Sequence, residues 1–237
     1  MKKPLISVII PTLNEGKYIE STLKSIINQD YKGKYEIIVA DGMSRDKTVR
    51  IARKFADKVI KVKQKGVSAG RNEGAKIAKG EILLFLDADT MLLFNSLTEI
   101  NKSFRTKKVV GVACPVLPIS PEAKDFALYW SFNQFMKESI KLKKPQIPGI
   151  FCAYRKKEFE KVGGFNEDLD TLEDFDLSER ISKEGKIVLT QSTLALTSHR
   201  RIKKWGRMKS IRKYLKLYFN YIVRKKTFNR NDYRPIR

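Results

Sequence analysis

The sequence lacks the features of a disulfide-stapled or membrane-spanning protein. Among 237 residues only two are cysteines, Cys114 and Cys152, and each lies in an apolar stretch. Two buried thiols need no disulfide, which predicts a reducing, cytoplasmic environment. The apolar run at residues 5–10 ends at Pro11, too short for a signal peptide, and no run of 18 apolar residues occurs. We therefore expect a cytoplasmic protein, with peripheral attachment to the cytoplasmic face of a membrane as an alternative.

Negative charge is scarce as well. The chain has 49 lysines and arginines against 26 acids, which leaves a net charge of +23. Such an excess predicts an anionic partner: nucleic acid, an acidic membrane surface or a phosphorylated ligand. Residues 200–237 contain 15 of the basic residues and a single acid, Asp232. This shift predicts a domain at residues 1–199 and a basic, aromatic-containing helical tail at residues 200–237.

Apolar residues make up 42% of the chain, enough for a folded core. Short β-branched runs alternate with amphipathic helical patterns. Strands are expected at residues 5–10, 36–40, 58–62, 81–86, 109–115, 148–154 and 187–190. Helices are expected at residues 15–29, 44–55, 67–78, 94–104, 122–141 and 172–183. The alternation predicts an α/β fold with a Rossmann-like, mostly parallel sheet flanked by helices, in which ligands bind beyond the carboxyl ends of the strands.

Polar residues follow the first two expected strands at that edge. The first strand leads into Pro11, Thr12 and Glu15, and the second into Asp41. Each one alone is explained by a helix cap or a turn, because these residue types are favoured there. Together they place hydroxyl and carboxylate groups along one edge of one sheet, which indicates a binding site.

Two further acids, Asp87 and Asp89, follow a fully apolar run at residues 82–86. Residues two apart on an extended chain point the same way, so both carboxylates face one spot. Their oxygens suit Mg²⁺ or Mn²⁺, which completes its shell with water and phosphate oxygens. The pair predicts a divalent-metal site, with a solvated turn as the alternative.

The order and spacing of these motifs resemble those of family 2 glycosyltransferases, which have a GT-A fold. The resemblance covers about residues 5–199. It rests on PTLNE at 11–15, DGMSRDKT at 41–48, RNEG at 71–74, GE at 80–81, DAD at 87–89, GGFNE at 163–167 and EDFDL at 173–177. It implies an enzyme that uses a nucleotide-diphosphate sugar and a divalent metal, Mn²⁺ or Mg²⁺.

The resemblance also implies roles at the sheet edge. Pro11, Thr12, Glu15 and Asp41 would bind the nucleoside, with Asp41 near the base or the ribose. Many relatives carry an aromatic residue where this chain has Leu13, so the sequence predicts neither uracil nor guanine.

Three more residues acquire expected roles in the same way. Arg71 would lie near the diphosphate, Asp87 would bind ribose and metal, and Asp89 would bind the metal. A surface arginine on a glycine-rich helix is the alternative explanation of Arg71.

Further along the chain, the resemblance places the catalytic base at Glu173-Asp174, and Asp174 is our candidate. An acceptor hydroxyl is a poor nucleophile until a base takes its proton. Attack opposite the leaving group would invert the anomeric centre. Acids in the first turn of a helix are also favoured by the helix dipole, so a capping role explains the same residues.

His199 is the only histidine in the chain. In several GT-A enzymes a histidine at this point completes the metal shell, so the resemblance implies a ligand beside Asp87 and Asp89. A structural histidine is the alternative. Arg200 and Arg201 would then bind the diphosphate.

Two explanations of the tail remain open. Basic helices with an aromatic face lie on anionic membrane surfaces, but an aromatic face can also pack on a domain. Its charge also fits a nucleic-acid-binding protein, but no nucleic-acid-binding motif accompanies it, so nucleic acid is not the expected partner. The expected acceptor is a hydroxyl on a glycan or on a lipid-linked glycan. Transfer to a polyprenyl phosphate remains an alternative, although an ionised phosphate needs no base.

Overall fold

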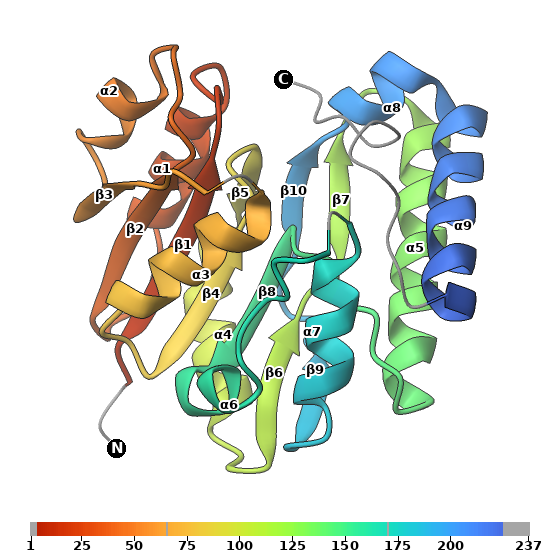
Figure 1. Cartoon of the computed structure of the whole chain (residues 1–237). Coiled ribbons are helices and arrows are strands. Elements are labelled where there is room, and N and C mark those ends of the chain that lie inside the picture. The colour runs from red at the N-terminus through yellow and green to blue at the C-terminus, as the bar shows by residue number, and fades with distance from the viewer. Residues whose placement is uncertain (1–3, 65, 170, 225–237) are drawn as a thin grey trace.

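A seven-stranded sheet forms the centre of the computed structural model, which describes residues 4–64, 66–169 and 171–224 (Figure 1). In sheet order its strands are β3 (Lys58–Lys61), β2 (Tyr35–Asp41), β1 (Ile6–Thr12), β4 (Ile82–Leu86), β8 (Phe151–Arg155), β6 (Val109–Ala113) and β9 (Lys186–Leu189). Neighbouring strands are parallel except at β8, which runs antiparallel to β4 and β6. All seven expected strands are present, and the mostly parallel α/β sheet is confirmed.

A second, three-stranded sheet has the order β5 (Thr90–Leu92), β10 (Ala195–Ser198) and β7 (Val116–Ile119). Sequence analysis missed it, because strands of three or four residues are too short to display an apolar alternation. β5 begins directly after Asp89, and β10 ends directly before His199 and Arg200. The small sheet therefore brings residues from distant parts of the sequence to the carboxyl edge of the large one.

Helices cover both faces of the large sheet (Figure 1). They are α1 (Ile19–Ile27), α2 (Thr48–Ala52), α3 (Val67–Ile77), α4 (Ser96–Phe104), α5 (Ala123–Lys141), α6 (Lys156–Lys161), α7 (Glu173–Ile181), α8 (Arg200–Trp205) and α9 (Arg207–Arg224). Side chains from α1 and α4 join the core on one face, and those from α3, α6 and α7 join the core on the other. The six helices expected before residue 184 are present, and the short α6 was missed.

Strand β4 explains how one apolar run serves both faces. Its five residues are all buried, and alternate side chains enter the two cores. Phe85 packs edge-on against Phe165, with ring centroids 4.9 Å apart, and lies 5.1 Å from Phe159. A strand buried on both sides has no need of polar alternation, which is why this run is continuous. Asp87 and Asp89 lie where it ends.

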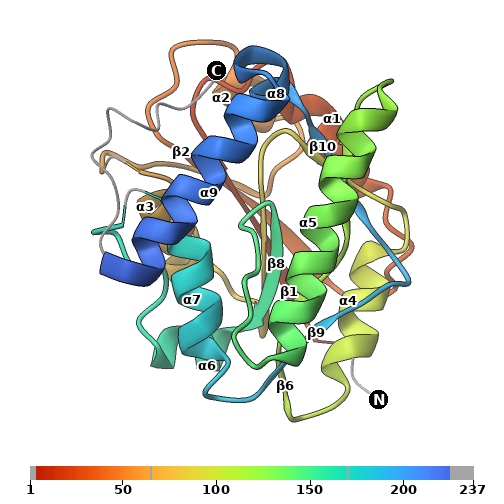
Figure 2. The same cartoon turned by 90° about the vertical axis from the view of Figure 1, so that its right-hand side faces the viewer.

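The described part of the basic tail forms α8 and α9, and α9 lies beside α5 and α7 (Figure 2). The ring of Tyr218 meets Phe135 of α5 at 5.5 Å and Phe175 of α7 at 6.2 Å between centroids. Leu217 is buried, and Arg207 forms an ion pair of 2.7 Å with Asp125. Residues 225–237 of the expected tail lie outside the described residues.

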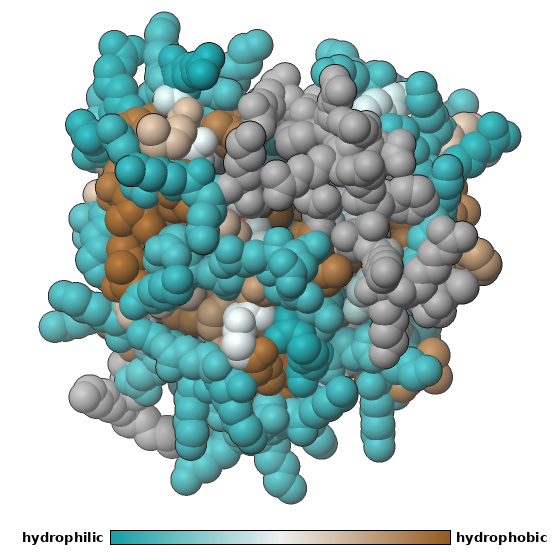
Figure 3. Space-filling model, viewed as in Figure 1, coloured by the Kyte–Doolittle hydropathy of each residue, from teal (hydrophilic) through white to brown (hydrophobic). Residues whose placement is uncertain are grey.

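The surface seen in Figure 3 is mostly hydrophilic, in keeping with the high charge of the chain. Within the described residues, no helix is both long and apolar enough to cross a membrane.

Candidate active site

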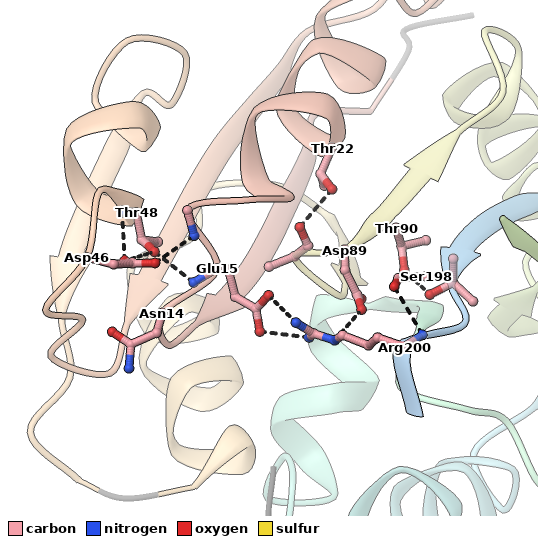
Figure 4. Close-up of polar contacts among 12 residues, drawn as sticks. Asn14, Glu15, Thr22, Asp46, Thr48, Asp89, Thr90, Ser198 and Arg200 are labelled. Atoms are coloured by element: carbon pink, nitrogen blue, oxygen red, sulfur yellow. Dashed lines mark hydrogen bonds and ion pairs between the residues drawn. The ribbon is translucent and has the colours of Figure 1, made fainter. Parts of the chain in front are cut away.

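The loops after β1 and β2 are tied to each other at the carboxyl edge of the sheet (Figure 4). The backbone N–H of Glu15 donates to Thr48 Oγ1 at 2.8 Å, and that of Gly16 donates to Asp46 Oδ2 at 2.9 Å. Asn14 adopts a left-handed φ of 56°, a conformation that asparagine tolerates better than most residues. These contacts fix the direction in which the Glu15 side chain leaves the loop.

Asp41 ends β2 and is almost completely buried. Its carboxylate accepts hydrogen bonds from Thr12 Oγ1 at 3.0 Å and from the backbone N–H and hydroxyl of Ser44. Thr12 and Asp41 are thus brought together as expected, in a contact that joins the last residues of β1 and β2. The expected contacts of Thr12, Asp41 and Pro11 with a nucleoside stay predictions.

Asp87 and Asp89 lie on a turn that several elements hold in place. Thr22 of α1 donates its hydroxyl to the carbonyl of Ala88 at 2.8 Å, and the N–H of Ser198 donates to the carbonyl of Asp89 at 3.1 Å (Figure 4). The N–H of Asp87 donates to the carbonyl of Ile150 at 3.2 Å. The alternative of a merely solvated turn is wrong for Asp89, whose side chain is 11% exposed.

Arg200 reaches from the start of α8 into the space between Glu15 and Asp89 (Figure 4). Its two terminal nitrogens bind the two Glu15 oxygens at 2.7 and 2.8 Å, and its Nε lies 3.0 Å from Asp89 Oδ2. The guanidinium also stacks over Tyr18, 4.9 Å from the ring centroid. Burial and the nearby charge of Asp87 raise the pKa of Asp89 to about 6, and Arg200 opposes that shift.

Arg71 forms a second, deeper network on α3. Its Nη2 lies 3.0 Å from Asp87 Oδ1 and 3.1 Å from the carbonyl oxygen of Gly149, and its Nη1 lies 2.7 Å from Glu173 Oε1. The side chain is 3% exposed, so the alternative of a surface arginine is wrong. Both terminal nitrogens are engaged within the protein, and the expected contact with a diphosphate stays a prediction.

Glycines make room for this arginine. A Cβ added at Gly149 would lie 2.2 Å from Arg71 Nη2, so a larger residue there would displace the guanidinium. A Cβ at Gly74 would lie 2.5 Å from a methyl carbon of Ile9, which lets α3 approach β1 closely. Gly149 lies outside β8, although a strand was expected from residue 148, and the Pro148-Gly149 pair is the sequence signal of a loop.

Asp174 lies in the first turn of α7 and is half-buried. Its Oδ2 accepts the N–H of Gly149 at 2.6 Å, and its Oδ1 accepts the N–H of Phe175 at 2.9 Å. Burial raises the pKa of Asp174 well above its usual value, the charge of Glu173 adds to the rise, and Arg71 opposes it. The N-cap residue Leu172 has a left-handed φ of 60° and makes no side-chain cap hydrogen bond, whereas Asp174 itself accepts a backbone N–H of the first turn. The helix-start explanation of Asp174 therefore stands beside the catalytic one.

The remaining expected residues lie beside the small sheet. The ring Nδ1 of His199 contacts the carbonyl oxygen of Ile119 on β7, and Arg201 lies 3.4 Å from the hydroxyl of Tyr214. Across the described ranges, no three or more His, Cys, Asp or Glu side chains are grouped so as to hold a metal. A role for His199 as a ligand, and the diphosphate contacts of Arg200 and Arg201, stay predictions.

The site therefore consists of two arginine-centred networks that share one turn. Asp89 belongs to the network of Arg200, and Asp87 belongs to the network of Arg71. The first network faces the loops after β1 and β2, and the second extends to Asp174 through Gly149. A Rossmann-like sheet with paired acids after β4 and a half-buried acid in the first turn of α7 agrees with the arrangement expected of GT-A glycosyltransferases.

Within that class, the chain belongs to glycosyl transferase family 2, whose model matches residues 7–163. It is 42% identical over 93 residues to the glycosyltransferase AglE of Haloferax volcanii, a match of 36% of this chain and 31% of that protein. It is 28% identical to a dolichyl N-acetyl-α-D-glucosaminyl phosphate 3-β-D-2,3-diacetamido-2,3-dideoxy-β-D-glucuronosyltransferase of Methanococcus voltae, over 94% of this chain and 75% of that protein.

Solved structures agree with the fold. The mannosyltransferase PcManGT of Pyrobaculum calidifontis, in complex with GDP-Man and Mn²⁺, superposes with a TM-score of 0.72 at 22% identity, over 100% of this chain and 68% of that one. TarS of Staphylococcus aureus, residues 1–349 with UDP-GlcNAc, gives a TM-score of 0.66 at 22% identity, over 89% of this chain and 61% of that one. The matches to AglE and to S. aureus TarS span only 31% and 16% of those curated proteins.

Proposed function

We propose that the protein is an inverting glycosyltransferase that moves a sugar from a nucleotide-diphosphate sugar to a hydroxyl group of a lipid-linked glycan. The observation that carries the proposal is the connection between the two halves of the site. Arg71 binds Asp87 on the donor side and Glu173 on the acceptor side. The carbonyl of Gly149 accepts from Arg71 and its N–H donates to Asp174, so the backbone of this residue joins the two. Donor and base are thereby held in a fixed relation, as a reaction between two bound substrates requires.

The donor side fits a nucleotide-diphosphate and a hard cation. Asp87 and Asp89 supply oxygen ligands, and the raised pKa of Asp89 indicates that its charge needs a cationic partner. With two protein carboxylates, the remaining ligands would be donor phosphate oxygens and water. Bound there, Mn²⁺ or Mg²⁺ would supply Lewis-acid stabilisation of the leaving diphosphate.

Arg200 would change its contact when the donor binds. It now compensates Asp89, and a guanidinium and a metal ion at one carboxylate repel each other. A diphosphate offers the planar guanidinium an alternative bidentate partner beside its contact with Glu15. We infer that Arg200 gives up Asp89 and binds the diphosphate, with Arg201 next to it in sequence as a second contact.

On the acceptor side, Asp174 would act as the general base. Its two backbone N–H contacts orient the carboxylate, and partial burial makes it a stronger base than an exposed aspartate. Once ionised, it would take the proton of the acceptor hydroxyl as that oxygen attacks the anomeric carbon. The leaving diphosphate departs from the opposite face, so the anomeric centre is inverted.

The acceptor class is inferred from relatives of this chain. The M. voltae relative carries in its name a dolichyl-phosphate-linked sugar as acceptor. A polyprenyl phosphate itself is a less suitable acceptor, because an ionised phosphate needs no base such as Asp174. A lipid-linked acceptor would place the protein at the cytoplasmic face of a membrane.

Product analysis tests the proposal. Purified protein, nucleotide-sugar donors and a lipid-linked monosaccharide are incubated with Mn²⁺, with Mg²⁺ and with a chelator, and the product is examined by NMR. We expect transfer only with metal, and a glycosidic bond opposite in configuration to that of the donor. Retention of configuration, or full transfer with the chelator present, would contradict the proposed mechanism.

A further inference from the structure

We propose that the outward face of α9 binds the surface of an anionic lipid bilayer. Met208, Leu215 and Phe219 are 63%, 63% and 66% exposed. Intervals of seven and four residues keep them on one side of the helix. Large apolar side chains in a row on an exposed helix face mark an interaction site, not ordinary surface.

The opposite side of α9 is packed on the protein. Ser210 and Leu217 are buried, and Tyr218 meets rings of both α5 and α7. The aromatic residues of the tail are therefore divided: Tyr218 packs inward and Phe219 points outward. Because its inner side packs on α5 and α7, α9 is held in place. The exposed side chains of its outer face therefore belong to a fixed surface of the protein.

Basic side chains accompany the apolar row. Lys209, Arg212 and Lys216 are exposed at neighbouring helical positions, and residues 200–224 contain no acid. In the orientation of Figure 3, a few brown side chains interrupt the teal surface along the right-hand margin, where α5 and α9 both lie in Figure 1. An amphipathic helix with such a composition lies in the headgroup region, where lipid phosphates meet the charges and acyl chains meet the apolar residues.

A bilayer matches both the basic and the apolar side chains of this face. A second copy of the chain would oppose one basic helix to another, and the like charges would repel. Nucleic acid would match the charges but leave Met208 and Leu215 in water. An anionic bilayer offers negative charge and an apolar interior at the same surface.

The inner face of α9 lies close to the proposed catalytic base. Tyr218 contacts Phe175, the residue after Asp174, so one helix separates the bilayer face from the base. If the proposed function holds, a lipid-linked acceptor would reach Asp174 from the headgroup region without leaving the membrane. The docking itself does not depend on the reaction.

Vesicle flotation of the full chain tests the proposal. We expect binding to phosphatidylglycerol vesicles, little binding to phosphatidylcholine vesicles, and at least about tenfold weaker binding of the Leu215→Glu, Phe219→Glu double variant. Lys209→Glu with Arg212→Glu should weaken binding mainly at low salt. The matched control is Phe94→Glu, which changes a side chain equally exposed at 67%, between β5 and α4, and should float like the wild type.

Three outcomes would overturn the proposal: equal flotation of the double variant and the wild type, no flotation of either, or a dimer in ultracentrifugation that the double variant abolishes. Thermal unfolding measured by circular dichroism checks that the two double variants fold. If Leu215→Glu with Phe219→Glu does not fold, the single variant Leu215→Glu replaces it. Donor binding measured without vesicles should be unchanged in every variant. Failure of the docking proposal is thereby distinguished from failure of the proposed transferase activity.

Discussion

Arg71 and Arg200 perform the same task in two different environments. Each binds one acid of the Asp87–Asp89 turn and one glutamate from another segment, Glu173 for Arg71 and Glu15 for Arg200. Arg71 is 3% exposed and Arg200 is 17% exposed. Arg71 also binds a backbone carbonyl and has Gly149 against it, whereas Arg200 lies over the ring of Tyr18.

The difference in burial implies different roles: Arg71 belongs to the fixed framework of the site, whereas Arg200 makes a contact that a ligand can replace. Removing one partner from a buried ion pair leaves an uncompensated charge, so Arg71 cannot leave its place without a large cost in free energy. Arg200 is less deeply buried than Arg71, and a diphosphate can offer its guanidinium another bidentate partner, so Arg200 can exchange one anion for another. The contrast predicts that Arg71 variants lose stability and that Arg200 variants lose donor affinity.

The largest effect is expected for Arg71→Met. It leaves the buried Glu173 and the partly exposed Asp87 without this partner, and we expect a loss of about 3 to 5 kcal/mol in the free energy of unfolding. Urea denaturation measures it. Arg50→Met, at an exposed position of α2, is the control and should change stability by about 0.5 kcal/mol or less. Wild-type stability of the Arg71 variant would show that the network is not the framework we describe.

A smaller effect is expected for Arg200→Gln. Loss of a charge-assisted contact should weaken binding of the donor's nucleotide-diphosphate by about ten- to a hundredfold, and binding of the matching monophosphate hardly at all. Calorimetry with both nucleotides measures this, and urea denaturation should show a smaller loss of stability than Arg71→Met does. An equal loss for both nucleotides would mean that Arg200 does not contact the diphosphate.

The pH dependence of transfer gives the mildest test. The base must be ionised, so the rate should rise with pH through the raised pKa of Asp174 and reach a plateau above it. Below that pKa the expected slope is about tenfold per pH unit. Measurement of kcat/KM between about pH 4 and pH 9 checks this prediction. A flat profile down to the ordinary pKa of an aspartate would contradict the raised value.

The sequence predicted the large sheet well because its strands contain runs of buried apolar residues, as in β1 and β4. It did not predict the small sheet, whose Thr90 and Thr197 pair through their hydroxyl groups instead of forming an apolar run. Asp41, Asp87 and Asp89 were found from their positions after strands, and Asp174 from the family resemblance. Arg71 and Arg200 were expected to contact the diphosphate, but their ion pairs with these acids were not predicted. Arg71 and Glu173 are 102 residues apart, and only the tertiary fold brings them together.

The substitution Asp174→Asn tests most directly the central claim, that the Arg71 framework holds a catalytic base against the donor site. Asp176→Asn is the matched control, since Asp176 is two residues along the same helix and pairs with Arg180 at 2.6 Å. We predict that Asp174→Asn lowers kcat/KM for transfer by about a hundred- to ten-thousand-fold while donor affinity is kept, and that Asp176→Asn does neither. Transfer by the Asp174 variant at the wild-type rate would contradict the account.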